Sequence, residues 1–167
     1  KLLNIVARII YQIKKLGPLK GLFYFIKDDI RWFFIDYFFD KKLGIDTFNN
    51  VETKDLGIAN KENANRYQPV SIKYLKISCN ILFTQEYNQY DIFLDIGCGK
   101  GKPSLYMLNM YPKIKSFIGI DISKKMIEIA NLNWKKLKKK NKLSLLNKKI
   151  FFIEQDVFKY EFKNDKR

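Results

Sequence analysis

Residues 91–101 read DIFLDIGCGKG, and this stretch decides the fold. Residues 91–96 form a short apolar, partly β-branched run, which predicts a buried strand. The glycines at 97, 99 and 101 predict a tight turn, and Pro103 suits the first turn of a helix. The stretch therefore indicates a strand, a glycine loop and a helix in succession.

Two further strands follow along the chain. Residues 115–120 read as a second buried strand that closes at Asp121, and residues 122 to about 140 read as a second helix. Residues 150–153 read as a third strand that ends near Asp156. This β-α-β-α-β alternation predicts an α/β fold, with a Rossmann-like parallel sheet and right-handed crossovers.

Ligands of such sheets bind at the carboxyl ends of the strands, where the glycine loop, Asp121 and Asp156 converge. Asp121 lies 20 residues after Gly101, a spacing that suits hydrogen bonds to ribose hydroxyls and predicts an adenosine-bearing cofactor. The loop reads GxGxG rather than the GxGxxG of dinucleotide sites. Asp95, two residues before the first glycine, suits an ammonium and a sulfonium better than a pyrophosphate. These details favour S-adenosyl-L-methionine over NAD.

The three segments carry a resemblance to a known superfamily. Residues 95–101, 117–123 and 154–158 look like motifs I, II and III of class I S-adenosylmethionine-dependent methyltransferases, in the same order and at matching spacing. The resemblance covers roughly residues 70–160. Upstream, residues 39–47, 56–58 and 67–69 are similar to the lead-in of a group of small bacterial methyltransferases.

The resemblance implies methyl transfer from S-adenosyl-L-methionine and a set of binding residues. The implied cofactor-binding residues are Asp95, Gly97, Cys98, Gly99, Gly101, Asp121, Ile122 and Asp156. Asp95 would lie near the cofactor's amino group, Asp121 would hold the ribose, and Asp156 would bind the adenine amino group. Ile122 would pack on adenine, and Tyr67 is a further candidate for closing over the site. The alternative is an ordinary tight turn with helix-capping acids.

The superfamily fold carries seven strands, and only three are found before Arg167. We therefore expect a chain truncated after the third strand, with an open edge at its first strand. We divide it into an α-helical N-terminal extension with a linker, residues 1–60, and the N-terminal half of a methyltransferase domain, residues 61–167. The motif that meets the acceptor is absent, so the catalytic residues and the methyl acceptor stay unknown. The chain alone is expected to turn over nothing.

Composition sets further bounds. The 167 residues are 47% hydrophobic and 29% charged, which is typical of one globular domain with a little extra chain. There is no His, and Cys79 and Cys98 are the only cysteines, which excludes a disulfide framework, a CxxC zinc site and a His-based triad. We expect no metal and a reducing, cytoplasmic setting. Without a His to act as its base, Cys98 reads as a small loop residue rather than a nucleophile.

The N-terminal region reads as two helices, residues 2–16 and about 19–39, separated by Gly17-Pro18. The apolar seam of the second helix consists of Phe23, Ile26, Ile30, Phe33 and Tyr37. Residues 1–39 could contact a membrane surface peripherally, but the acids at 28, 29, 36 and 40 disfavour an anionic bilayer. We favour a hairpin packed on the main domain or on a partner. No apolar run is long enough for a transmembrane segment.

Two rival functions remain open. The net charge is +15, and a cluster of lysines near the end of the helix over 122–140 would suit a nucleic-acid-binding module, with Trp134 stacking on a base or buried against the sheet. The cluster consists of Lys135, Lys136, Lys138, Lys139, Lys140 and Lys142. The second rival is a non-catalytic remnant of a methyltransferase that serves a partner through its exposed half-sheet.

Overall fold

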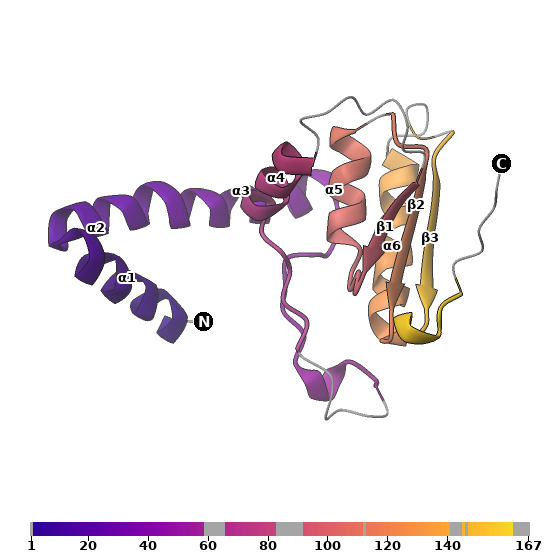
Figure 1. Cartoon of the computed structure of the whole chain (residues 1–167), viewed down its shortest axis with the longest axis horizontal. Helices are drawn as coiled ribbons and strands as arrows, with labels where there is room; N and C mark the ends of the chain where they lie inside the picture. Colours follow the sequence, from indigo (N-terminus) through magenta and orange to yellow (C-terminus); the bar gives the residue numbers. More distant parts are fainter. Residues whose placement is uncertain are drawn as a thin grey trace.

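The structure, a computed structural model, describes residues 2–58, 66–82, 92–111, 113–140, 145 and 147–161. Its centre is a three-stranded parallel sheet in which β1, β2 and β3 lie side by side in that order (Figure 1). The strands are β1 (Ile92–Ile96), β2 (Ser116–Asp121) and β3 (Lys149–Glu154), joined by α5 (Lys102–Met110) and α6 (Lys124–Lys140). The predicted β-α-β-α-β order and Rossmann-like α/β fold are confirmed. Residue 91 lies outside the described part.

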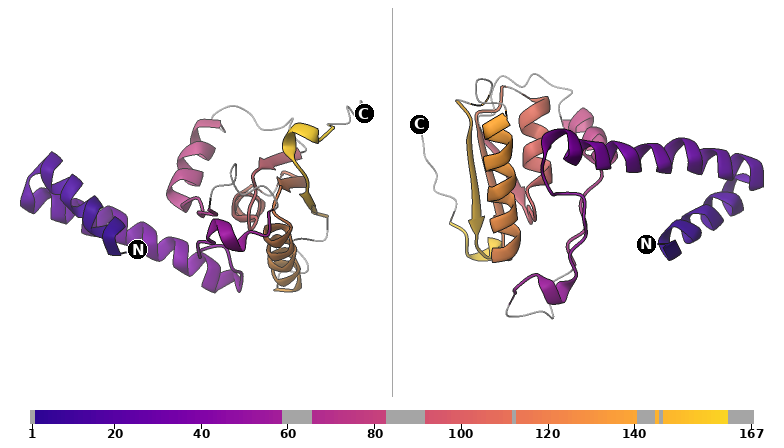
Figure 2. Two further views of the ribbon diagram at one scale, coloured as in Figure 1. Left: turned by 90° about the horizontal axis from the view of Figure 1, so that it is seen from below. Right: turned by 180° about the vertical axis from the view of Figure 1, so that it is seen from behind.

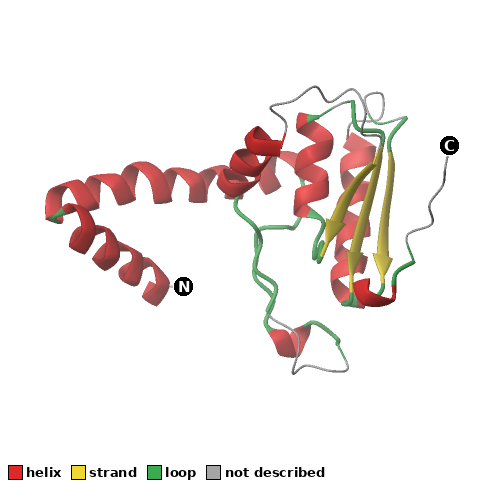
Figure 3. Cartoon of the chain, viewed as in Figure 1, coloured by secondary structure: helices red, strands yellow, loops and turns green. Residues whose placement is uncertain are grey.

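One face of the sheet is covered and the other is open. Phe117 and Phe152 are buried in one cluster with Leu105 of α5, and α5 and α6 lie on the same side of the strands (Figure 3). On the opposite face, Leu94 and Phe151 are exposed. Among the described residues, β1 pairs only with β2, as expected for an open first-strand edge.

The N-terminal arm, residues 2–43, is helical apart from one glycine turn. Helix α1 (Leu2–Leu16) is followed by Gly17, whose φ of +80° favours glycine. Helix α2 (Pro18–Tyr24) then runs without a break through the π-helix η1 (Phe25–Ile30) into α3 (Arg31–Leu43). The predicted helix over 2–16 is confirmed, and the second helix extends four residues beyond its predicted end.

Helices α1 and α2 form a hairpin that extends away from the sheet (Figure 2). Gly21 lies at their contact, because a Cβ there would be 2.6 Å from the backbone of Gln12 and Ile13. The close packing of the two helices therefore depends on a residue without a side chain at this position.

The π turn changes which face of the long helix meets the domain. Phe23, Ile26, Ile30 and Phe33, the first four members of the predicted seam, are exposed. Trp32, Ile35 and Phe39 pack against the core instead. A π turn takes in more residues than an α turn and so rotates the following side chains around the axis. Of the two expected ways of covering this seam, packing on the main domain is not observed for Phe23, Ile26 and Ile30, Phe33 meets Phe48 while staying half-exposed, and packing on a partner stays a prediction.

Two buried carboxylates of α3 fix the following segment. Asp40 accepts hydrogen bonds from the Thr47 hydroxyl at 2.5 Å and from the Phe48 backbone N–H at 2.6 Å. Asp36 lies 2.7 Å from the ammonium of Lys102 at the start of α5. Asp40 thus holds the first part of the predicted connecting segment, residues 40–69, against α3, and Asp36 links α3 to the domain.

The remaining lead-in elements are short. They are the 3₁₀ helix η2 (Thr53–Asp55) and α4 (Ile72–Leu82). The helix predicted from residues 70–89 is confirmed over α4, while residues 83–91 lie outside the described part. The predicted domain boundary after residue 60 also falls outside it, within residues 59–65. That boundary stays a prediction.

Candidate functional site

The loop after β1 depends on glycine. Gly97, Gly99 and Gly101 have φ values of +69°, +51° and +81°, in the left-handed region that other residues rarely adopt. The Gly97 backbone N–H donates to the Ile120 carbonyl at 2.8 Å, which ties the loop to the end of β2. The predicted tight glycine turn is therefore present at the carboxyl end of β1.

Asp121 closes β2 and holds the glycine loop from the side. One carboxylate oxygen accepts a hydrogen bond from the Gly99 backbone N–H at 2.8 Å, and the other accepts one from Ser123 at 2.8 Å. Each oxygen of an ionised carboxylate can accept a further bond. The Asp121 side chain is thus oriented by the backbone and retains acceptor capacity for a ligand.

Asp156 lies two residues beyond the end of β3. It caps the short 3₁₀ helix η4 (Val157–Lys159), because its carboxylate accepts a hydrogen bond from the Phe158 backbone N–H at 3.0 Å. Helix capping was the alternative reading of such an acid. The capping bond occupies one acceptor position and leaves the others available.

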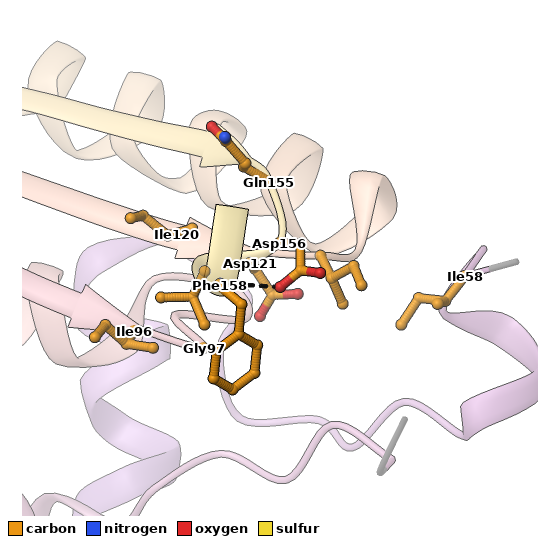
Figure 4. A pocket seen from close by; sticks show the side chains of 10 residues that line it. Ile58, Ile96, Gly97, Ile120, Asp121, Gln155, Asp156 and Phe158 are labelled. Atoms are coloured by element: carbon orange, nitrogen blue, oxygen red, sulfur yellow. Dashed lines mark hydrogen bonds between the residues drawn. The ribbon is translucent and has the colours of Figure 1, made fainter. Parts of the chain in front are cut away.

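These strand ends enclose a pocket of about 530 Å³ (Figure 4). The carboxylates of Asp121 and Asp156 lie close together and face the same space (Figure 4). The described lining consists of Ile58, Ile96, Gly97, Ile120, Asp121, Ile122, Gln155, Asp156, Val157 and Phe158. Four predicted site residues, Gly97, Asp121, Ile122 and Asp156, are therefore brought together. The apolar Ile58 and Ile96 also line the pocket, although the sequence argument did not name either as a site residue.

The other four predicted residues do not line the pocket. Gly99 and Gly101 shape the loop, and Cys98 and Asp95 are buried. The Asp95 carboxylate accepts a hydrogen bond from the Ser104 hydroxyl at 2.9 Å, so it faces α5. The structure thus places Asp95 behind the loop, and its contact with a cofactor amino group stays a prediction.

We expect Asp95 to make the chain less stable as the pH rises from about 4 to about 6. Burial raises the pKa of Asp95 to about 6, against partial opposition from the Ser104 hydrogen bonds. In that window the folded chain keeps the proton that the unfolded chain releases, so up to about 3 kcal/mol of unfolding free energy is lost. Asp95→Asn should lack this decline in urea titrations at several pH values. A difference from the wild type that is constant with pH would contradict the expectation.

Cys98 is unsuited to nucleophilic chemistry. Its side chain is buried, and burial together with the nearby Asp95 and Asp121 carboxylates raises the pKa of its thiol. A thiol with a raised pKa stays protonated at neutral pH and reacts poorly. The geometry agrees with its interpretation as a small loop residue.

Tyr67 lies against the glycine loop. The loop residues that it contacts, Gly99 and Lys100, do not line the pocket. A Cβ on Gly99 would be 2.3 Å from the Tyr67 ring, and the Tyr67 hydroxyl donates to the Thr47 carbonyl at 2.9 Å. The ammonium of Lys100 lies 5.5 Å from the centre of the same ring and 3.0 Å from Asp46. Tyr67 therefore supports the loop, and its closure over the pocket stays a prediction.

Asn133 of α6 is a positioning residue that the sequence argument missed. Its buried side-chain amide donates to the carbonyls of Asp46 and Lys100 at 2.9 and 3.1 Å and accepts from the Asp46 N–H at 2.9 Å. It therefore clamps the lead-in to the glycine loop. The sequence does contain a signal for this role. Asn133 lies seven residues after Met126 and three after Ala130, a spacing that places its amide on the apolar face of the helix.

The basic cluster lies near the end of α6. Lys135, Lys136, Lys138, Lys139 and Lys140 are exposed, and Lys142 lies outside the described residues. Trp134 is partly buried against the core, with the Lys138 ammonium 5.9 Å from its ring. Of the two fates considered for Trp134, burial is the one observed. Among the described residues, no group of His, Cys, Asp or Glu has the arrangement of a metal site.

Comparisons with known proteins find similarity in the part of the chain that contains the three strands and most of the pocket lining. Residues 88–166 match a family model described as a methyltransferase domain. An X-ray structure of YjhP from E. coli is similar in part, with 16% sequence identity and a TM-score of 0.38. The match covers 59% of this chain and 36% of that one, so the chain spans about a third of that protein. No curated protein matches.

Proposed function

We propose that the pocket binds S-adenosyl-L-methionine for methyl transfer to an acceptor, a function supported by the match of residues 88–166 to a methyltransferase domain model. The observation that carries the proposal is the meeting of Gly97, Asp121 and Asp156 in one cavity. These residues follow three different strands, and their convergence is what a ligand site at the carboxyl edge of a parallel sheet requires.

The lining residues fit an adenosine. A volume of about 530 Å³ lies in the usual range of small-ligand pockets. Asp121 offers two negatively charged acceptors to the two ribose hydroxyls, and Asp156 offers an acceptor to the adenine amino group. Ile122 and Val157 supply apolar surface for the faces of the purine ring. This donor and acceptor pattern supports the proposal.

When bound, the cofactor would supply a methyl group on a positively charged sulfur. The residues of this chain would bind and orient it: Asp121 would fix the ribose, and the glycine loop would let the backbone approach closely. Orientation matters because the acceptor atom must lie in line with the methyl carbon and the sulfur. We assign no catalytic residue, since cofactor binding accounts for the polar lining.

Calorimetric titration of the chain with S-adenosyl-L-methionine, S-adenosylhomocysteine and NAD tests the proposal. We expect saturable binding of the first two and none of NAD, because the GxGxG loop and the negative charge of Asp95 beside it disfavour a pyrophosphate at the loop. Binding of NAD at equal affinity, or no binding of either adenosyl compound, would overturn it.

A further inference from the structure

The long helix of the N-terminal arm carries a series of exposed apolar residues. They lie three or four residues apart along α2, η1 and α3, except for the adjacent Phe33 and Phe34, and Phe33 also packs edge-on against Phe48; Leu19 is 84% exposed and Phe23 is 65% exposed. We call these residues the exposed stripe: Leu19, Phe23, Ile26, Ile30, Phe33, Phe34 and Phe38. So much contiguous apolar surface on a helix that extends away from its domain marks an interaction site.

Three acids of the arm, Asp28, Asp36 and Asp40, are held by other groups of the chain. Asp36 is buried against Lys102, and Asp40 is buried against Thr47. Asp28 pairs with Lys73 of α4. Three of the four acids that argued against an anionic surface are thus occupied by contacts within the chain. The side chain of Asp29 lies outside what the structure describes.

The cations of the arm remain on its surface. The exposed basic residues are Lys14, Lys15, Lys20, Lys27, Arg31, Lys41 and Lys42. Lys27 lies 5.7 Å from the centre of the Phe23 ring, and Lys41 lies 5.2 Å from that of Tyr37. Basic groups therefore flank the exposed stripe. Their long side chains can keep the charged ends in water while their stems lie along the apolar surface.

A shallow groove of about 870 Å³ continues the stripe between α3 and α5. It has an apolar floor and a basic rim. Its described lining includes Phe34, Phe38 and Met110, with Arg31, Lys41 and Lys42 at its border. The combination of apolar floor and cationic rim extends from the arm onto the domain itself.

We propose that the exposed stripe and this groove dock on the surface of an anionic lipid bilayer. The apolar side chains would enter the boundary between headgroups and acyl chains, and the flanking cations would meet lipid phosphates. Each Lys or Arg near such a surface contributes about 1 kcal/mol, so seven of them provide a strong attraction. No helix among the described residues is long and apolar enough to cross a membrane, so the arm would lie on the surface.

Charge decides between a bilayer and a second copy of the chain. Two arms meeting stripe to stripe would bring their exposed cations together, and the buried Asp36 and Asp40 would not offset this charge. An anionic bilayer offers both an apolar layer and a sheet of negative charge. The proposal is independent of the cofactor pocket, so either can fail alone.

Vesicle flotation tests the proposal. We expect the full chain to bind vesicles of equal phosphatidylcholine and phosphatidylglycerol, and to bind pure phosphatidylcholine at least about tenfold more weakly. Leu19→Ser with Phe23→Ser removes apolar contacts from two exposed positions and should weaken binding about tenfold or more. Lys20→Glu with Lys27→Glu reverses two of the flanking charges and should also weaken vesicle binding about tenfold or more.

The matched control is Lys135→Glu with Lys139→Glu on α6, which changes the net charge equally at exposed positions outside both the stripe and the groove lining. We expect it to retain most of the vesicle binding. Equal binding to both kinds of vesicle, equal loss in the control, or wild-type binding by both arm variants would overturn the proposal. Self-association without vesicle binding, abolished by Leu19→Ser with Phe23→Ser, would overturn it in favour of a second copy.

Discussion

Asp121→Asn is expected to lower the affinity of the chain for S-adenosyl-L-methionine by about 100-fold or more. Both Asp121 oxygens already accept hydrogen bonds from the backbone, so the side chain cannot turn to present a single acceptor. Asparagine replaces one oxygen with an amide donor, which would then face the N–H of Gly99 or Ser123. A hydrogen bond to a charged group contributes about 1.5–3 kcal/mol, and two such bonds to the ribose would weaken together.

Calorimetry of Asp121→Asn beside Lys138→Ala checks this expectation. Lys138 is exposed on α6 and contacts Trp134, outside the pocket lining, so its truncation should leave cofactor affinity unchanged. Far-UV circular dichroism establishes that both variants are folded. If folded Asp121→Asn bound the cofactor within about threefold of the wild type, Asp121 would be only a loop-holding residue.

The convergence of the pocket residues was predictable because it follows from topology alone. β-Branched runs bounded by Gly or Asp gave the strands, and parallel pairing brings their carboxyl ends to one edge. Gly97, Asp121 and Asp156 meet for that reason. The direction of Asp95 was harder to predict. It shares a face with Phe93 by strand alternation, but β1 is apolar on both faces, so the pattern does not reveal which face the helices cover.

The orientation of the long N-terminal helix was not predictable from periodicity. The π turn over Phe25–Ile30 contains neither Gly nor Pro, so the sequence carries no local signal for it. A regular α-helix places Phe23 and Phe33 on a packing seam, whereas the structure leaves both exposed and turns Asp36 inward. This orientation matters for the proposed docking surface, because it leaves Phe33 exposed and turns Asp36 toward Lys102.

The burial of two lysines could not be predicted from residue type either. Lys100 and Lys102 are 2% and 1% exposed, although lysine is almost never fully buried unless paired. Their partners, Asp46 and Asp36, lie 54 and 66 residues away in the sequence. Such pairs depend on the finished tertiary structure, and local sequence patterns do not encode them.

Asp36→Ala is expected to lower the unfolding free energy of the chain by about 3–5 kcal/mol, the largest stability effect that we predict. The carboxylate lies 2.7 Å from the Lys102 ammonium and also accepts hydrogen bonds from the Ser71 hydroxyl and the Ile72 backbone N–H, at 2.6 and 2.8 Å. Alanine would leave a fully buried ammonium without its anion. Since the pair joins α3 to the helix after the glycine loop, its loss would also loosen the arm.

Urea unfolding of Asp36→Ala, Lys102→Met and the double variant measures the pair, with Asp28→Ala as the control from the same continuous helix. The Asp28–Lys73 pair is about one-quarter exposed on both sides, whereas Lys102 is 1% exposed, so water screens the Asp28–Lys73 pair more and its loss should cost less. Lys102→Met in the Asp36→Ala background should restore stability, because methionine needs no counterion. Equal, small losses for Asp36→Ala and Asp28→Ala would mean that the Lys102 ammonium reaches water. The arm would then be held to the domain mainly by its apolar contacts through Trp32, Ile35 and Phe39.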